Sequence, residues 1–461
     1  MKSRTERDSM GEVEVPAQAL YGAQTQRAVD NFTISRRPMP ARFIRALAQL
    51  KASAARANRK CGTLDPDIAE ALEAAAAAVA GGKYLDQFPV PVFQTGSGTS
   101  TNMNMNEVLA RLATEASGRA VHPNDHANCS QSSNDVIPST IQVSAAVGLQ
   151  DRLRPGLHSV AETIRTRAGE LARVVKTGRT HLMDAMPLTL GQELGAWAGQ
   201  LEECDARFGD LLPRLCKLPI GGSAVGTGIN VPPGFPGELV KHLGEQLGLD
   251  FTASDNPFTR MAGQDVALEC SACLRSLALV LAKINNDLRW MSSGPLAGLA
   301  EIELEALQPG SSIMPGKVNP VLPEAVLMAA AEVVGNDSAI ALAAHSGNFQ
   351  LNVMLPLVAD RLADSTELLV GACEATARTV TGFRVNHAQL RRSLASNPIL
   401  VTALNATIGY EAAAAIAKRS YAEGRPVLDV AEEETDLSRE ELEVLLDPIR
   451  LTNTGVRSGE E

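Results

Sequence analysis

The sequence has few aromatic residues: among 461 residues there are two Trp, four Tyr and ten Phe, so aromatic residues make up only 3%. Sheets favour β-branched and aromatic residues, whereas small and unbranched side chains suit close helix packing. The core must therefore be built mainly from Ala, Leu, Val, Ile and Met. An all-β fold is disfavoured.

The sequence also lacks an excess of positive charge. It has 42 basic and 53 acidic residues, which gives a net charge of −11 at neutral pH. Proteins that bind nucleic acid or anionic membranes display a basic surface that this composition does not provide. A small anionic ligand would need a local pocket lined by cations or N–H groups.

Disulfide and membrane signals are missing as well. The seven cysteines are an odd number scattered along the chain, which favours reduced thiols and a cytoplasmic location. Cys270 and Cys273 form a C-x-x-C without a second pair at zinc spacing, and they lie in an apolar helical pattern that favours packing. Because no run of about 18 apolar residues appears, we expect no transmembrane segment.

Helical patterns dominate what is present. An alanine-rich stretch between Pro66 and Gly81 has Pro at its start and Gly after its end, as helices often do. Two apolar stripes with spacings of three and four predict long helices over 149–174, with a possible bend at Pro155-Gly156, and over 266–291. Further helical patterns cover 187–212, 324–334 and 356–379. Such long stripes favour an all-α bundle extended by neighbouring subunits.

Polar, glycine-rich segments interrupt these patterns and are where chemistry is expected. They cover residues 94–106, 122–138, 178–192, 221–236 and 309–320. The first, Gln94 to Asn102, concentrates hydroxyls and glycines before a helix, an arrangement that favours an anion. No Walker lysine follows it, and a simple N-cap turn is the alternative.

Three segments carry candidate chemical groups. His122 and His126 have the spacing of a helical metal pair, but Pro123 makes a continuous helix doubtful, so a wall of hydrogen-bonding groups is favoured over a metal. His181 can take and return a proton near neutrality. The segment 309–320 combines glycine hinges with Lys317 and Asn319, which can stabilise developing negative charge.

Residues 310–320 (GSSIMPGKVNP) resemble the signature loop of the fumarase/aspartase superfamily. Four more segments extend the resemblance to class II fumarate hydratases: 95–107 (TGSGTSTNMNMNE), 122–135, 178–193 (GRTHLMDAMPLTLGQE) and 346–353 (SGNFQLNV). His181 and Gly316 favour a fumarase, because aspartases resemble these motifs with Gln and Ala there. Residues 321–324 (VLPE) and 352–354 (NVM) are closer to the aspartase pattern, so aspartate ammonia-lyase or another lyase of the superfamily is the alternative.

The resemblance implies an all-α, three-domain fold with a tetrameric helical core. Its expected domains are an N-terminal domain over 1–134, a central bundle of long helices over 135–387 and a small helical C-terminal domain over 388–461. Each active site would be assembled from three subunits. No metal and no organic cofactor is implied, and the substrate would be a small dicarboxylate in a reversible hydration of fumarate to malate through an aci-carboxylate intermediate.

The resemblance also implies residue roles. Ser311 would be the base, Lys317 and loop N–H groups would stabilise its anion, and His181, oriented by Glu324, would handle the proton of the leaving hydroxyl through a water. The expected substrate contacts are Ser97, Gly98, Thr99, Ser132, Ser133, Asn134, Thr180, Ser312, Lys317 and Asn319. A second, nearby dicarboxylate site would involve His122, Asn124 and Asp125.

Overall fold

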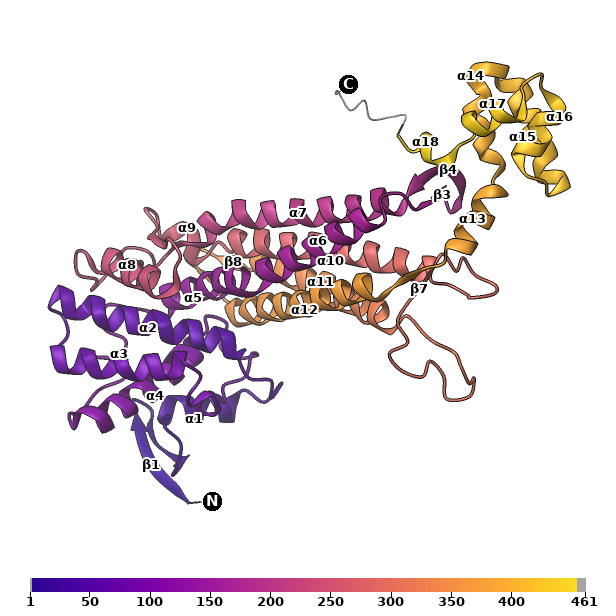
Figure 1. The fold of residues 1–461 in the computed structure, drawn as a ribbon. Coiled ribbons are helices and arrows are strands. Elements are labelled where there is room, and N and C mark those ends of the chain that lie inside the picture. Colours follow the sequence, from indigo (N-terminus) through magenta and orange to yellow (C-terminus); the bar gives the residue numbers. More distant parts are fainter. Residues whose placement is uncertain (1, 454–461) are drawn as a thin grey trace. The chain divides into compact units, whose positions relative to one another are not determined.

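The computed structural model describes residues 2–453 and is mainly helical, with five small two-stranded sheets in the described part (Figure 1). The chain forms two compact units. The first contains residues 1–155, 204–278 and 329–371, and the second contains 156–203, 279–328 and 372–461. The division into domains 1–134, 135–387 and 388–461 stays a prediction, and residues 454–461 lie outside the described residues.

Five long helices each contribute to both units: α6 (Arg154–Glu170), α7 (Leu190–Leu215), α10 (Asp265–Met291), α11 (Val321–His345) and α12 (Leu355–Gly382). The first unit also contains β1 (Ser3–Asp8), β2 (Gly11–Pro16), α1 (Ala23–Asn31), α2 (Ala41–Cys61), α3 (Pro66–Ala80), η1 (Leu85–Gln87), α4 (Thr99–Ser117), α5 (Ser133–Gly148), η2 (Leu149–Leu153), β5 (Lys217–Leu218), α8 (Phe235–Leu247), β6 (Thr252–Ala253), α9 (Phe258–Met261), β8 (Gly347–Asn348) and β9 (Leu351–Asn352).

The second unit contains β3 (Val175–Thr180), β4 (Met183–Thr189), β7 (Ile302–Glu303), β10 (Arg384–Val385), α13 (His387–Ala395), η3 (Pro398–Leu404), α14 (Asn405–Ile408), α15 (Tyr410–Glu423), α16 (Val427–Glu434), α17 (Arg439–Leu445) and α18 (Pro448–Leu451). Figure 1 draws α14–α17 as a cluster of short helices. Their shared core is aliphatic and includes Leu404, Ile416, Val430 and Leu442.

The predicted helices over the alanine-rich stretch and over 266–291 are confirmed, whereas the stripe predicted over 149–174 is helical only as far as Glu170. Asp65 caps α3 by accepting from two backbone N–H groups, and Pro66 occupies its first turn. Helix α10 covers the predicted stripe from residue 266 to residue 291. The suggested bend at Pro155-Gly156 is not where the irregularity lies, because the π-helical turn η2 precedes both residues. Pro155 is the second residue after this π-helical turn, and the backbone stays helical through it.

Helix α11 corrects the expectation that no long apolar stretch is present. By length and composition it could cross a membrane. Two of its residues are nevertheless buried and polar. The Asn336 amide donates to Asp364 at 2.9 Å, and Asp337 accepts from Ser271 at 2.7 Å. These contacts with α12 and α10 are typical of a helix inside a protein bundle.

Three segments that we expected to be irregular contain regular structure. Residues 178–192 include most of the β3–β4 hairpin, α4 begins at Thr99, and α5 begins at Ser133 and includes Pro138. The first turns of α4 and α5 are polar although most of their residues are buried, so they show no amphipathic periodicity. The starts of both helices are marked instead by their N-cap residues, Gly98 and Ser132.

Candidate functional site

The first predicted substrate-binding segment precedes and opens α4. The Ser97 and Thr99 hydroxyls lie 2.8 Å apart, so these two predicted residues are brought together. Gly98 is the N-cap residue with a φ of +74°, a conformation that favours glycine. Gly96 approaches the backbone so closely that a Cβ there would lie 1.7 Å from the carbonyl oxygen of Val353. Gly98 is thus favoured by its backbone conformation, and Gly96 by the close approach of the Val353 backbone.

The second segment forms the N-terminus of α5. Ser132 and Asp135 make a capping box, in which the Ser132 N–H donates to Asp135 at 3.0 Å. The Asn134 amide donates to the carbonyl of Ala224 at 2.8 Å. The Ser133 hydroxyl accepts from the amide of Asn102, a residue of α4, at 2.9 Å. The two predicted segments are therefore joined by a buried hydrogen bond, next to a helix end that favours anions.

Asp135 anchors a third segment to this site. Its second carboxylate oxygen accepts from the backbone N–H groups of Gly221 and Ser223, both at 2.9 Å. Burial raises the pKa of Asp135 to about 6, while these N–H groups and the nearby Lys51 oppose that rise. Asp135 lies in the 122–135 motif, but its capping role is visible only in the structure.

The His122 segment forms its own turn. The His122 Nδ1 atom lies 3.2 Å from a carboxylate oxygen of Asp125 and accepts from the N–H groups of Asn124 and Asp125. The Nδ1 atom of His126 accepts from the N–H of His122 at 2.9 Å. Among residues 2–453 no three His, Cys, Asp or Glu side chains are grouped to hold a metal. The side chains of His122 and Asp125 are both exposed.

His181 lies at the tip of the β3–β4 hairpin. Thr180 pairs with Met183, so His181 and Leu182 are the two turn residues, with φ values of 55° and 61°. Positive φ at both positions defines a type I′ turn, for which Asn and Gly are the usual residues. A histidine and a leucine in this conformation are strained, and such strain is often found at functional sites. In the single chain, His181 is exposed to solvent.

A buried ionic cluster holds the base of this hairpin. The ammonium of Lys176 lies 2.8 Å from Glu193 and 3.0 Å from Glu301, and Arg179 pairs with Glu301 at 2.6 Å. The side chains of Lys176 and Glu301 are only 2% and 1% exposed. Glu301 directly precedes β7, so it ties the hairpin to the segment that leads into the 309–320 loop. Sequence reasoning missed this cluster.

The 309–320 loop closes on itself. The N–H of Gly310 donates to the carbonyl of Lys317 at 2.8 Å, and the Asn319 amide donates to the carbonyl of Gly310, also at 2.8 Å. The Ser311 Oγ accepts from the N–H groups of Ile313 and Met314, at 3.2 and 3.1 Å. Two N–H donors aimed at one hydroxyl oxygen stabilise its deprotonated form. The side chains of Ser312 and Lys317 are exposed.

Glu324 lies in the first turn of α11, at the end of this loop. Its N–H donates to the carbonyl of Pro320 at 3.1 Å. Within residues 2–453, His181 and Glu324 share neither a hydrogen bond nor an ion pair. The predicted orientation of His181 by Glu324 is therefore not made by the described chain on its own.

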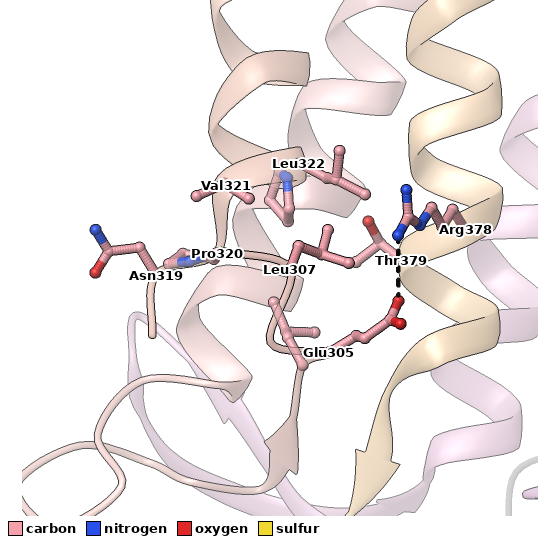
Figure 2. Close-up of a pocket in the computed structure, with 10 residues that line it drawn as sticks. Glu305, Leu307, Asn319, Pro320, Val321, Leu322, Arg378 and Thr379 are labelled. Atoms are coloured by element: carbon pink, nitrogen blue, oxygen red, sulfur yellow. Dashed lines mark ion pairs between the residues drawn. The ribbon is translucent and has the colours of Figure 1, made fainter. Parts of the chain in front are cut away.

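A small hollow next to the loop is a poor candidate for a dicarboxylate site (Figure 2). Most of its lining is apolar, including Leu307, Val321 and Leu322. Its Arg378 already pairs with Glu305 at 3.7 Å. Figure 2 shows that the side chain of Asn319 points away from the Arg378 side of the hollow.

The chain is similar to known proteins over nearly its whole length. Residues 11–335 match the family described as Lyase, and residues 400–453 match the family described as Fumarase C C-terminus. "Fumarate hydratase class II 2" of Pseudomonas aeruginosa is 56% identical over 98% of this chain and 99% of that one. A "Fumarate hydratase class II" of Xylella fastidiosa is 54% identical over 98% and 96%.

Solved structures agree with these relatives. A class II fumarase from Schistosoma mansoni covers 99% of this chain and 100% of its own, with a TM-score of 0.95 and 34% identity. A fumarate lyase:delta crystallin from Brucella melitensis, bound to cobalt, covers 98% and 100%, with a TM-score of 0.94 and 40% identity. The expected all-α fold and family resemblance are thus confirmed, and the chain belongs to the class II fumarate hydratase family.

Proposed function

We propose that the chain is a hydro-lyase that catalyses the reversible hydration of fumarate to (S)-malate, a reaction of the tricarboxylic acid cycle. The observation that carries the proposal is sequence identity, over nearly the full length, to relatives named class II fumarate hydratases. It is 56% for one of them. The His181 imidazole supports the same assignment, since hydration needs a group that moves protons through water.

In the direction from malate, the first step removes a proton from the carbon beside one carboxylate. Ser311 in its alkoxide form takes this proton, and the electron pair of the C–H bond moves onto the carboxylate to give the aci-carboxylate. The N–H groups of Ile313 and Met314 support the alkoxide, because both donate to the Ser311 Oγ. Lys317, a residue of the same loop, adds a positive charge that favours the alkoxide.

In the second step the C–O bond to the hydroxyl breaks and the carbon–carbon double bond forms. His181, acting through a bound water, supplies the proton with which the hydroxyl leaves as water. Glu324 orients His181 across subunits of the tetramer proposed below, since the two residues share no contact within the described chain. In the hydration direction His181 takes a proton from the attacking water, so the two roles reverse.

The substrate carboxylates are held by hydroxyl, amide and N–H groups rather than by metal. The proposed contacts are Ser97, Gly98, Thr99, Ser132, Ser133, Asn134, Thr180, Ser312, Lys317 and Asn319. This set is supported by the α5 N-terminus, where three of the side chains gather at the positive end of a helix dipole. His122, Asn124 and Asp125 are proposed as a second dicarboxylate site, and the exposure of His122 and Asp125 is compatible with that role.

We also propose a cytoplasmic homotetramer in which three subunits build each site, with the three domains given above. Support comes from large apolar side chains that the described chain leaves exposed on two long helices. Leu279 of α10 is 53% exposed, and Met328 and Leu342 of α11 are 69% and 72% exposed. Sedimentation velocity on the purified protein tests this proposal, and a monomer at micromolar concentration would reject it.

One set of assays tests the reaction. Purified protein is given fumarate, malate or aspartate, with and without a chelator, and the fumarate absorbance and ammonia are followed. We expect interconversion of fumarate and malate that the chelator does not change. Ammonia release from aspartate without turnover of malate would instead identify an aspartate ammonia-lyase.

A further inference from the structure

A buried lysine lies behind the proposed carboxylate-binding segment and has no part in the mechanism above. Lys51 is in the middle of α2 and only 3% exposed. Its neighbours in the helix, from Leu47 to Ala55, include alanines and Leu50 that are also buried. Burying an ammonium among aliphatic side chains is unfavourable unless it is compensated, so the contacts of Lys51 show what it is for.

The contacts of Lys51 lead to the substrate-binding segment. The Lys51 ammonium donates to the side-chain oxygen of Asn128 at 3.1 Å. The same oxygen accepts from the amides of Asn102 at 3.1 Å and Asn106 at 3.2 Å. Asn102 uses its amide again to donate to the Ser133 hydroxyl at 2.9 Å. Lys51 is thus connected to Ser133 through Asn128 and Asn102.

The direction of each hydrogen bond in this chain matters. An ammonium can only donate, so Asn128 must present its oxygen to Lys51 and its amide group elsewhere. The Asn128 amide indeed donates to the carbonyl of Gln131 at 3.1 Å. Because the oxygen of Asn128 faces Asn102, Asn102 presents its own amide both to Asn128 and to Ser133. The Ser133 oxygen then acts as an acceptor inside the protein, and its proton is free to point to a ligand.

Asp135 is the acidic group that acts on Lys51. Its attraction raises the pKa of Lys51, whereas burial lowers it, and the pKa is about 7. The carboxylate of Asp135 is itself held by the N–H groups of Ser132, Gly221 and Ser223. Lys51 therefore interacts electrostatically with the carboxylate that caps the N-terminus of α5.

We infer that Lys51 is a positioning residue for dicarboxylate binding: through Asn128 and Asn102 it sets the Ser133 hydroxyl to donate to a substrate carboxylate. The inference rests on the proposed function only in taking the Ser133 segment as part of the substrate site. It assigns Lys51 no contact with the substrate. Its removal should therefore weaken dicarboxylate binding more than it slows the reaction of bound substrate.

The test compares Lys51→Met with the wild type. Succinate, an unreactive dicarboxylate, is titrated calorimetrically, and KM and kcat for fumarate are measured on the same preparations. We expect Lys51→Met to raise the Kd of succinate and the KM of fumarate at least tenfold and to change kcat less than threefold. Lys60→Met is the matched control, because Lys60 is an exposed residue of the same helix that pairs with Glu238. It should leave all three constants unchanged.

Asn128→Ala is a second variant that serves if Lys51→Met does not fold, since Asn128 is only partly buried. It should raise the Kd of succinate to a similar extent, and the double variant should add little further. A Kd and KM within twofold of the wild type in these variants, with only a lower Tm, would overturn the inference. So would a wild type that binds no succinate. Succinate binding without fumarate turnover would reject the proposed reaction alone, because the calorimetric comparison needs no turnover.

Discussion

The two proposed halves of the site are built in opposite ways. The Ser132–Asn134 segment begins a buried helix. The Asn102 side chain of α4 donates to Ser133, and the backbone N–H groups of Gly221 and Ser223 hold the neighbouring Asp135. The 309–320 loop is held mainly by hydrogen bonds between its own residues, and most of its side chains are exposed in the chain. A helix end fixed by a buried network suits binding, whereas an exposed loop can bring a base to a substrate that is already held.

Because of this difference, substitutions in the two regions should affect stability and activity differently. A residue in the buried half contributes to both the folded state and the binding site, so its removal should affect both. A residue in the exposed loop contributes little to the free energy of unfolding, so its removal should affect turnover alone. The following substitutions test that separation.

The largest effect is expected for Ser311→Ala. Removal of the proposed base should lower kcat/KM for fumarate by about 1,000-fold or more, with almost no change in Tm because Ser311 is not buried. Fumarate absorbance and a circular dichroism melt measure the two quantities. Ser338→Ala, which removes an exposed hydroxyl bonded to its own helix, is the control. Activity within tenfold of the wild type would exclude Ser311 as the base.

His181→Asn should lower kcat by about 100- to 1,000-fold. Asparagine tolerates the positive φ of the hairpin turn, so the backbone conformation is kept while the imidazole ring is lost. Leu182→Asn changes the adjacent turn residue, which has the same conformation and an exposed side chain, and should remain active. Equal loss in both variants, measured at saturating fumarate, would mean that the turn rather than the ring matters.

Ser133→Ala should have a moderate effect on both properties. We expect a KM for fumarate about tenfold higher, which is about 1.4 kcal/mol of binding, and a free energy of unfolding lower by about 1–2 kcal/mol because the amide of Asn102 loses an acceptor. Kinetics and urea unfolding give the two values. Ser139→Ala removes a buried hydroxyl of the same helix that bonds to Asp135 backbone, and should change stability only. If Ser139→Ala raised the KM for fumarate as much as Ser133→Ala does, the proposed binding role of Ser133 would be rejected.

The last prediction concerns Lys51 and the pH dependence of stability. Burial holds the pKa of Lys51 at about 7 in the folded state, below the ordinary 10.5 of the unfolded chain. Between these values the unfolded state binds more protons, so Lys51 makes the free energy of unfolding rise with pH, by at most about 1.4 kcal/mol per pH unit. Asp135, with a pKa of about 6, is mostly ionised throughout this window.

Melting curves between pH 7 and pH 9 measure this effect. Lys51→Met should have a flatter dependence of Tm on pH than the wild type, and Lys60→Met should follow the wild type. Parallel curves for the wild type and Lys51→Met would show that the lysine titrates outside this range.

Much of the fold could be predicted because its signals are local. The proline and glycine around α3 and the apolar spacing in α10 are read directly from neighbouring residues. The β3–β4 hairpin could not be predicted in the same way, because its turn residues are His181 and Leu182 rather than the usual Asn and Gly. The starts of α4 and α5 were missed because polar side chains are buried there by contacts between helices.

Composition, periodicity and ordered motifs were enough to predict the fold class, the family and the candidate residues. How those residues are held could be seen only once the chain was folded. Lys51 has no motif around it, and Glu301 is more than 100 residues from Lys176 and Arg179, a separation of 122 from Arg179. Hydrogen-bond direction and burial depend on which distant segments meet, and that information is absent from local sequence patterns.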